Sequence, residues 1–112
     1  RVGACAQAVL LDRAAASDDL GQDRCWPAPW RELCLRAGLR AILSTPVPGP
    51  EGPVASFALF FDAPRAMGEH EFELGKFGAY LASLVFARDR AARVREQAEG
   101  ALRASSIEGQ LL

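Results

Sequence analysis

After Met67 and Gly68, the chain has a long stretch without proline from Glu69 to Leu112. Because proline inside a helix removes a backbone hydrogen bond, a proline-free segment of this length predicts one long helix. Glu69, Glu71 and Glu73 lie in its first turns, where acidic side chains interact favourably with the helix dipole. If the helix continues to Ser105, it is about 55 Å long at about 1.5 Å per residue. It must then project beyond any core that the rest of the chain can form.

The predicted helix changes character along its length. After Phe86, charged residues and alanine replace the large apolar residues of the first half. A face that packs on a sheet is predicted in the first half, at Phe72, Phe77, Leu81, Leu84 and Val85. Spacing by three and four residues, as in the a and d positions of a weak coiled coil, is found at Leu84, Ala87, Ala91, Val94, Ala98 and Ala101. Residues 88–112 are therefore expected to be a signalling or coiled-coil helix that pairs in a homodimer.

A β-hairpin is predicted immediately before this helix. The segments Arg40–Val47 and Pro53–Phe61 flank residues 48–52, where two prolines and two glycines favour a turn between antiparallel strands. In the second segment both alternating sets of side chains are largely apolar. Such a pattern predicts a central strand that is covered on both faces.

Shorter elements are expected in the first forty residues, separated by a loop at Gly21–Pro29 that is rich in glycine, aspartate and proline. Gly38 is expected to end the last of them, in which Trp30, Leu33 and Ala37 would share one face. The predicted elements are a helix over Ala4–Leu11, a short buried strand over Ala14–Asp18 and a helix over Trp30–Ala37.

Composition excludes several classes of protein. With 112 residues, half of them hydrophobic, the chain is expected to form one domain with a packed core. The 13 basic and 14 acidic side chains nearly cancel, which argues against a nucleic-acid or membrane-surface partner. The apolar runs are shorter than the roughly 20 residues of a bilayer span, and no signal peptide is evident.

The cysteine and histidine content bears on compartment and metal binding. Three cysteines, Cys5, Cys25 and Cys34, are an odd number and lack C-x-x-C spacing, which argues against a disulfide framework and a zinc knuckle. A reducing, cytoplasmic location fits best. With His70 as the single histidine, no metal site is expected.

Several blocks of the sequence, in the right order, resemble the GAF family of sensory domains. Near the amino terminus, Val2–Ala8 resembles the family's G-x-x-C-x-x-A helix. The strongest likeness follows later, to the S-T-P-I, (S/T)-F-A-L-Y-Y and P-R pattern of bacterial GAF sensors. It is carried by Ser44–Val47, Ser56–Phe61 and Pro64–Arg65. The resemblance extends over residues 2–90.

The resemblance implies an α/β (α+β) fold, in which helices flank an antiparallel sheet. The family places a helix and two strands before the G-x-x-C block, whereas this sequence begins at Arg1. Residues 1–87 are therefore expected to form a GAF-like domain that is incomplete at its N-terminus. Its unpaired strand edges are expected to promote self-association or strand exchange.

A small-molecule pocket on one face of the sheet is also implied. By resemblance, its candidate residues are Cys5, Asp18, Asp19, Trp26, Trp30, Ser44 and Thr45. Ordinary structural roles compete with ligand binding at several of these positions. Trp30 could be a core residue, Asp18 a loop cap and Thr45 a solvent-facing strand residue. Cys5 could be a reactive thiolate at a helix start or an inert buried thiol.

The function implied is that of a cytoplasmic sensor in a bacterial signalling protein, such as a histidine kinase of a two-component system or a diguanylate cyclase. No catalytic residue or metal is expected, and neither the ligand nor any cofactor is identified. Arg95–Ser105 resembles the E-x-A-L-R-x-S linker that precedes output domains. One alternative is a dimerisation module that binds nothing. Another is a GAF-type methionine sulfoxide reductase, although the cysteine spacing does not resemble that family's.

Overall fold

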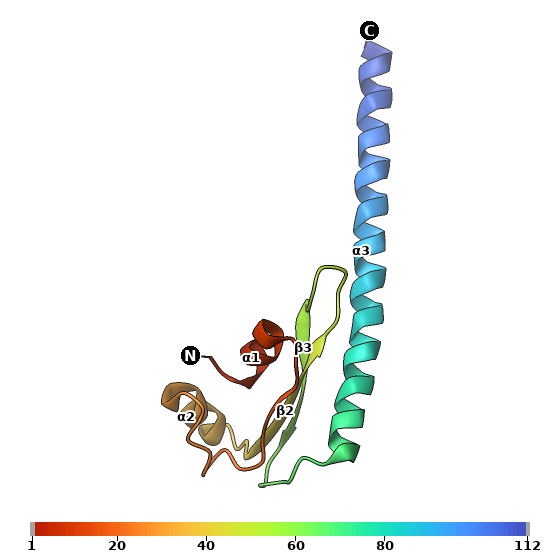
Figure 1. Ribbon diagram of the computed structural model, residues 1–112. Coiled ribbons are helices and arrows are strands. Elements are labelled where there is room, and N and C mark those ends of the chain that lie inside the picture. The colour runs from red at the N-terminus through yellow and green to blue at the C-terminus, as the bar shows by residue number, and fades with distance from the viewer. Residues whose placement is uncertain (1, 112) are drawn as a thin grey trace.

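The computed structural model describes residues 2–111. The three strands form one antiparallel sheet in the order β1-β2-β3, with α1 and α2 on one side and α3 on the other (Figure 1). This arrangement confirms the predicted α+β fold class. The elements are α1 (Ala4–Leu11), β1 (Ala15–Ser17), α2 (Ala28–Arg36), β2 (Ala41–Val47), β3 (Ala55–Phe61) and α3 (Glu69–Leu111).

The middle strand of the sheet is β2. It pairs with β1 from Ala15–Ser44 to Ser17–Ile42 and with β3 along its whole length. The prediction that the second hairpin strand is central was wrong. Within the described residues β3 pairs with β2 alone, and most of its side chains are only half-buried. An apolar run indicates that other elements can cover both faces of a strand. Which strand is in the middle of the sheet depends on where β1 pairs, and β1 pairs with β2.

Alternate side chains of β2 face the two layers of helices. Ile42 belongs to the same buried cluster as Ala4 and Ala8 of α1, all of them inaccessible to solvent. Leu43 and Thr45 face α3, where the backbone of Gly75 lies against both side chains. The core of the domain is therefore divided by the sheet into an α1–α2 side and an α3 side.

The second helix begins at Ala28 rather than at the predicted Trp30, because Pro29 fits within the first helical turn. Gly38, with φ +84°, adopts the left-handed conformation just after the helix and ends it as predicted. The face that Trp30, Leu33 and Ala37 were expected to share is mostly exposed, since Leu33 is 60% exposed and Ala37 is also exposed. The inward side chain is Cys34, one helical turn from Trp30.

The long helix α3 has 43 residues, and the molecule measures 71 × 29 × 23 Å. The predicted projection beyond the core is confirmed (Figure 1). The predicted packing face was wrong, however. Small residues contact the sheet instead, with Gly75 and Ala79 buried and Gly78 against the ring of Phe57. The large apolar side chains remain 46–68% exposed at Phe77, Leu81, Leu84 and Val85.

An apolar groove follows from this packing. It has a volume of about 450 Å³ and lies between β3 and the outward side of α3. The groove lies beside the edge of β3 that is unpaired within the described residues, and together they leave an apolar surface on this part of the domain. The expected self-association through such an edge stays a prediction. The groove is lined by Phe57, Leu59, Leu74, Phe77, Gly78, Leu81, Ala82 and Val85. No helix among the described residues is long and apolar enough to cross a membrane.

The close approach of α3 to the sheet predicts opposite effects for one substitution at two glycines. Gly75→Ala should destabilise the domain by about 1–3 kcal/mol, because the added methyl group would lie 2.6 Å from Oγ1 of Thr45. Thr45 is β-branched and buried, so it cannot move aside.

Gly100→Ala is the matched control, because the nearest neighbouring atom, on Arg103, is 4.0 Å from the added methyl group. Alanine favours helix by about 1 kcal/mol over glycine, so this variant should gain helix content. Urea unfolding and circular dichroism of both variants test the prediction. Equal or greater stability of Gly75→Ala would contradict the packing described.

Candidate functional site

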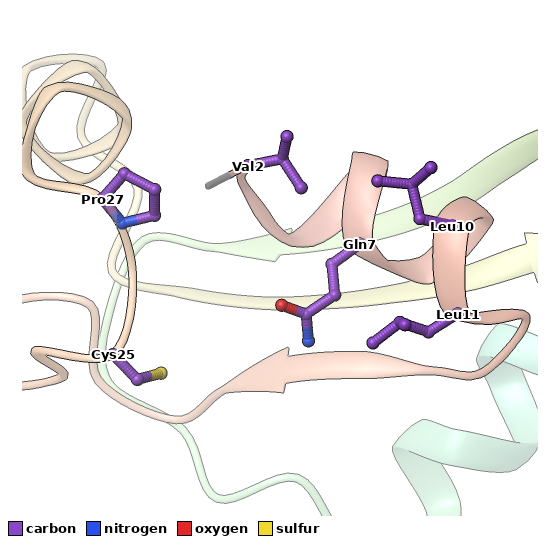
Figure 2. A pocket seen from close by; sticks show the side chains of 6 residues that line it. All are labelled: Val2, Gln7, Leu10, Leu11, Cys25 and Pro27. Atoms are coloured by element: carbon purple, nitrogen blue, oxygen red, sulfur yellow. The ribbon is translucent and has the colours of Figure 1, made fainter.

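A pocket of about 330 Å³ lies between α1 and the segment that leads into α2 (Figure 2). Its walls form because Ala4 and Ala8 turn inward, so that Leu10 and Leu11, 71% and 50% exposed, remain on the outer side of α1. The volume lies within the range of about 300–1,000 Å³ that ligand pockets occupy. The lining residues are Val2, Gln7, Leu10, Leu11, Cys25 and Pro27.

Two polar side chains line this pocket. The amide of Gln7 points from α1 across the space above β1 (Figure 2), and within the described chain it makes no hydrogen bond. The side chain of Cys25 is hydrogen-bonded to Asp23, and the backbone N–H of Cys25 donates to Oδ1 of Asp23 at 3.1 Å. None of the lining residues that the structure describes carries a basic or carboxylate side chain.

Asp23 connects the pocket wall to the core. Its Oδ2 accepts hydrogen bonds from Oγ of Ser17 at 2.8 Å and from Nε1 of Trp26 at 3.0 Å. Burial alone would raise the pKa of Asp23, but the hydrogen bonds from Cys25, Ser17 and Trp26 outweigh it and hold the pKa below its ordinary value. The charged carboxylate therefore holds the loop, the end of β1 and a core indole together.

A second set of contacts continues from β1 to α3. The carbonyl oxygen of Asp18, which follows Ser17, accepts from the backbone N–H of Arg65 at 2.8 Å. Oδ1 of Asp18 accepts from the N–H of Met67 at 3.2 Å. The Arg65 guanidinium lies 3.1 Å from Oε2 of Glu71. With Cys25 and Asp23, these residues form a continuous set of contacts, here named the Cys25–Glu71 network.

Glu71 also closes the first turn of α3. Its Oε1 accepts from the backbone N–H of Gly68 at 2.8 Å, which caps the helix start. This hydrogen bond, followed by the one from Arg65, lowers the pKa of Glu71. Glu71 is therefore a buried structural acid, although it belongs to the series of acids that the sequence predicted at the helix start.

The two tryptophans of the predicted site lie in the α1–α2 core. Their ring centroids are 5.4 Å apart and tilted by 54°. Trp26 is almost fully buried, whereas Trp30 is half-buried and covers Gly3 at the start of α1. Cys5 packs against the same cluster. None of these three side chains lines the pocket of Figure 2.

The remaining predicted residues are distributed over both faces of the sheet. Ser44 faces α1 and Thr45 faces α3, and both hydroxyl oxygens are buried without a hydrogen-bond partner in the described part of the chain. Thr45 is only 8% exposed, so the alternative of a solvent-facing strand residue was wrong. The Asp18 carboxylate accepts from the distant N–H of Met67, whereas Asp19 accepts from the N–H of Gly21 in its own loop at 3.1 Å.

The cysteines form no disulfide within the described chain. Burial, followed by the proximity of Cys5, raises the pKa of the Cys34 thiol, so this side chain resists ionisation. The described residues also contain no group of three or more histidine, cysteine or acidic residues arranged to hold a metal ion.

Sequence reasoning missed Gln7, Leu10, Leu11 and Asp23 as parts of the site. One signal was available in the first helix, where small residues alternate with large ones at helical spacing. The small residues mark the buried face, and the large ones must then line the exterior. The role of Asp23 had no such signal, because it depends on where the loop places its carboxylate.

Comparison with known proteins defines the fold. No protein-family model matches the sequence, and no characterised relative is found. Among solved structures, a domain of a protein described as a two-component sensor histidine kinase, from Sinorhizobium meliloti, matches with a TM-score of 0.67 and 15% identity. The match covers 75% of this chain and 57% of that one.

Two further structures are similar. GAF3 from a Synechocystis protein, in its photoproduct state, has a TM-score of 0.63 and 21% identity over 73% of this chain and 52% of that one. A type II free methionine-R-sulfoxide reductase from Thermoplasma acidophilum has a TM-score of 0.57 and 17% identity over 72% and 53%. The chain spans little more than half the length of these structures, and its fold is GAF-like.

The two acids with lowered pKa values predict the pH dependence of stability. Because both pKa values lie below those of the unfolded chain, 3.8 for Asp23 and 4.5 for Glu71, their contribution is present above these values and is lost on acidification. Asp23→Asn should remove about 1–3 kcal/mol at neutral pH and weaken the dependence on acid.

Asp62→Asn is the matched control, since Asp62 is exposed and makes no hydrogen bond or ion pair within the described residues. Unfolding free energies between pH 3 and pH 7 would measure the effect. The same acid dependence in the wild-type chain and in Asp23→Asn would contradict the role of Asp23.

Proposed function

We propose that this chain is a sensory domain of a bacterial signal-transduction protein, of the two-component sensor kinase or diguanylate cyclase type. It binds a small molecule in the cytoplasm and passes the signal through α3 to an output domain. The observation that carries this proposal is the Cys25–Glu71 network, which connects a pocket wall to the first turn of the long helix. The similarity to a sensor histidine kinase domain supports it.

The mechanism follows from what a ligand would displace. A molecule seated against Cys25 alters the contact between this residue and Asp23, and Asp23 also holds Ser17. Asp18, the next residue, holds the backbone of Arg65 and Met67. A shift there changes the pairing of Arg65 with Glu71 and the start of α3. A helix with two discrete packing positions on the sheet can then act as a switch.

The residues that the family resemblance assigns to the ligand site take different parts in this proposal. Trp26 donates to Asp23, which is hydrogen-bonded to the wall residue Cys25, whereas Asp18 accepts from Met67 in the segment before α3. Direct ligand contact by the others requires the pocket to deepen into the core when α1 moves outward. These are Cys5, Asp19, Trp30, Ser44 and Thr45. The buried, unpartnered hydroxyl of Ser44 on the α1 side supports such an extension.

Homodimerisation through α3 is part of the proposal. Large apolar side chains remain exposed on this helix at Phe77, Tyr80, Leu84 and Val94, at successive spacings that fit a and d positions. Pairing of these positions in two copies would cover them. It would also join two α3 helices into one mechanical element.

A ligand-free dimerisation module is a second candidate function, favoured by the same exposed residues of α3. The reductase alternative is supported by one structural neighbour and by the presence of Cys5 and Cys34 in one cluster. The raised pKa of the buried Cys34 thiol opposes it, because the thiolate is the reactive form. We therefore place catalysis last among the three.

Native mass spectrometry of the purified chain, combined with hydrogen exchange, tests ligand binding and transmission together. We expect a retained small molecule whose removal increases amide exchange in α1 and in the first turn of α3. In Asp18→Ala the effect on α1 should persist, whereas the effect on α3 should be lost, because Asp18 holds the connection before the helix.

Asp62→Asn serves as the control for this experiment and should behave as the wild-type chain does. A retained molecule that alters exchange in α1 but never in α3 would contradict transmission through the network. A chain that retains no molecule and does not respond to a metabolite panel would favour the dimerisation module.

Dimerisation gives a separate prediction. Leu84→Glu places a charge in the proposed helix pair and should raise the dimer dissociation constant by at least about tenfold. Glu96→Gln, an exposed change on the same helix, is the control. Sedimentation equilibrium measures both, and a monomeric wild-type chain at high concentration would contradict the dimer.

A further inference from the structure

The chemistry of the pocket in Figure 2 restricts what it can bind. Its volume of about 330 Å³ is near the lower end of the range for ligand pockets. A tetrapyrrole would extend well beyond such a space. The pocket has room for a small molecule, such as one aromatic ring with a short substituent.

The walls offer nothing that stabilises an ionic ligand. Val2, Leu10, Leu11 and Pro27 are apolar, and none of the six lining residues is basic or a carboxylate. The indole of Trp30 lies against Gly3, immediately before the start of α1. A charged molecule would therefore lose its hydration without a compensating partner.

One polar group remains available to orient a ligand. The Gln7 amide points into the space between α1 and β1 (Figure 2), and it makes no hydrogen bond to any other described residue. The side chain of Cys25 is hydrogen-bonded to Asp23. An amide both donates and accepts, so Gln7 matches a carbonyl, amide or hydroxyl group.

We propose that this pocket selects a small, neutral, largely apolar molecule that carries one carbonyl, amide or hydroxyl group, which Gln7 recognises. This inference rests on the proposed function, since it names the ligand class of the same sensory pocket. The apolar part of the molecule contacts Leu10, Leu11 and Pro27. The polar group lies against the Gln7 amide.

The test compares two probes of the same shape and different charge. Phenylacetamide is neutral and phenylacetate is its anionic counterpart, and each is titrated into the ¹⁵N-labelled 112-residue chain. Phenylacetamide should shift the backbone resonances of Gln7, Leu10, Leu11 and Cys25. Phenylacetate should bind at least about tenfold more weakly, because the pocket does not compensate its charge.

A variant separates recognition by Gln7 from a structural role. Gln7→Leu keeps the approximate volume but removes the amide, and it should weaken phenylacetamide binding by about three- to tenfold. Toluene, which has no polar group, should bind this variant at least as well as the wild-type chain. Gln97→Leu, on the exposed part of α3, is the matched control and should leave all probes unchanged.

Each outcome decides the proposal. Selective binding of phenylacetamide that depends on Gln7 supports it. Equal or tighter binding of phenylacetate at the same residues overturns the ligand class but leaves a sensory pocket in place. If no probe shifts these resonances, the ligand class is also overturned, and the proposed function then stands or falls on the retained-molecule experiment. Equal loss of phenylacetamide and toluene binding in Gln7→Leu overturns recognition by Gln7.

Discussion

The helices on both sides of the sheet approach it through small side chains, and the rest of the structure depends on this close contact. Ala4 and Ala8 carry α1 onto β2 from one side, whereas Gly75 and Ala79 carry α3 onto it from the other. Contacts at this distance gain dispersion energy only when no side chain intervenes. The larger apolar residues of each helix are consequently directed away from the sheet. On α1 they form the pocket wall, and on α3 they form the groove and the exposed helix surface.

Charged hydrogen bonds connect the two halves of this arrangement. The strands themselves give no direct contact between the 23–25 loop and the start of α3. Asp23 and Asp18 connect them in steps. The Asp23 carboxylate accepts from Ser17, Trp26 and the backbone of Cys25, and Asp18 accepts from Arg65 and Met67 in the segment between β3 and α3. Hydrogen bonds to a carboxylate are stronger than those between neutral groups. Hydrogen bonds therefore run from the loop, through the end of β1, to the β3–α3 connection.

The GAF-like fold by itself leaves the function open. The structural neighbours include a sensor kinase domain, a photoproduct-state GAF domain and an enzyme, all at low sequence identity. One fold that serves such different proteins places its function in local chemistry. In this chain the pocket has apolar walls and one uncommitted amide, and the cysteine in the core is buried. These features are the local chemistry on which the proposed function rests.

Much of the secondary structure could be predicted from the sequence, because it depends on local signals. The absence of proline after Glu69, the turn at 48–52 and the left-handed Gly38 determine where the long helix, the hairpin and α2 are found. The face that each element buries could not be predicted in the same way. Hydrophobic spacing assigned Phe77 and Leu33 to the packing faces of their helices. In the structure the smaller residues Gly75 and Cys34 are buried instead, because the helices pack closely. The order of the strands likewise depended on β1, a short segment with little local signal.

The candidate site shows the same division between local and tertiary information. Sequence and family resemblance indicated Trp26 and Asp18 as ligand residues, which stays a prediction; in the structure Trp26 donates to Asp23, and Asp18 accepts from the segment before α3. They also grouped Ser44 with Thr45. These two residues are adjacent on a strand, so their side chains point to opposite faces of the sheet. Gln7, Leu10 and Asp23 entered the site only through the tertiary structure. The physical reason is that a pocket is formed by side chains left outside the closest contacts, and those contacts exist only after the helices have packed on the sheet.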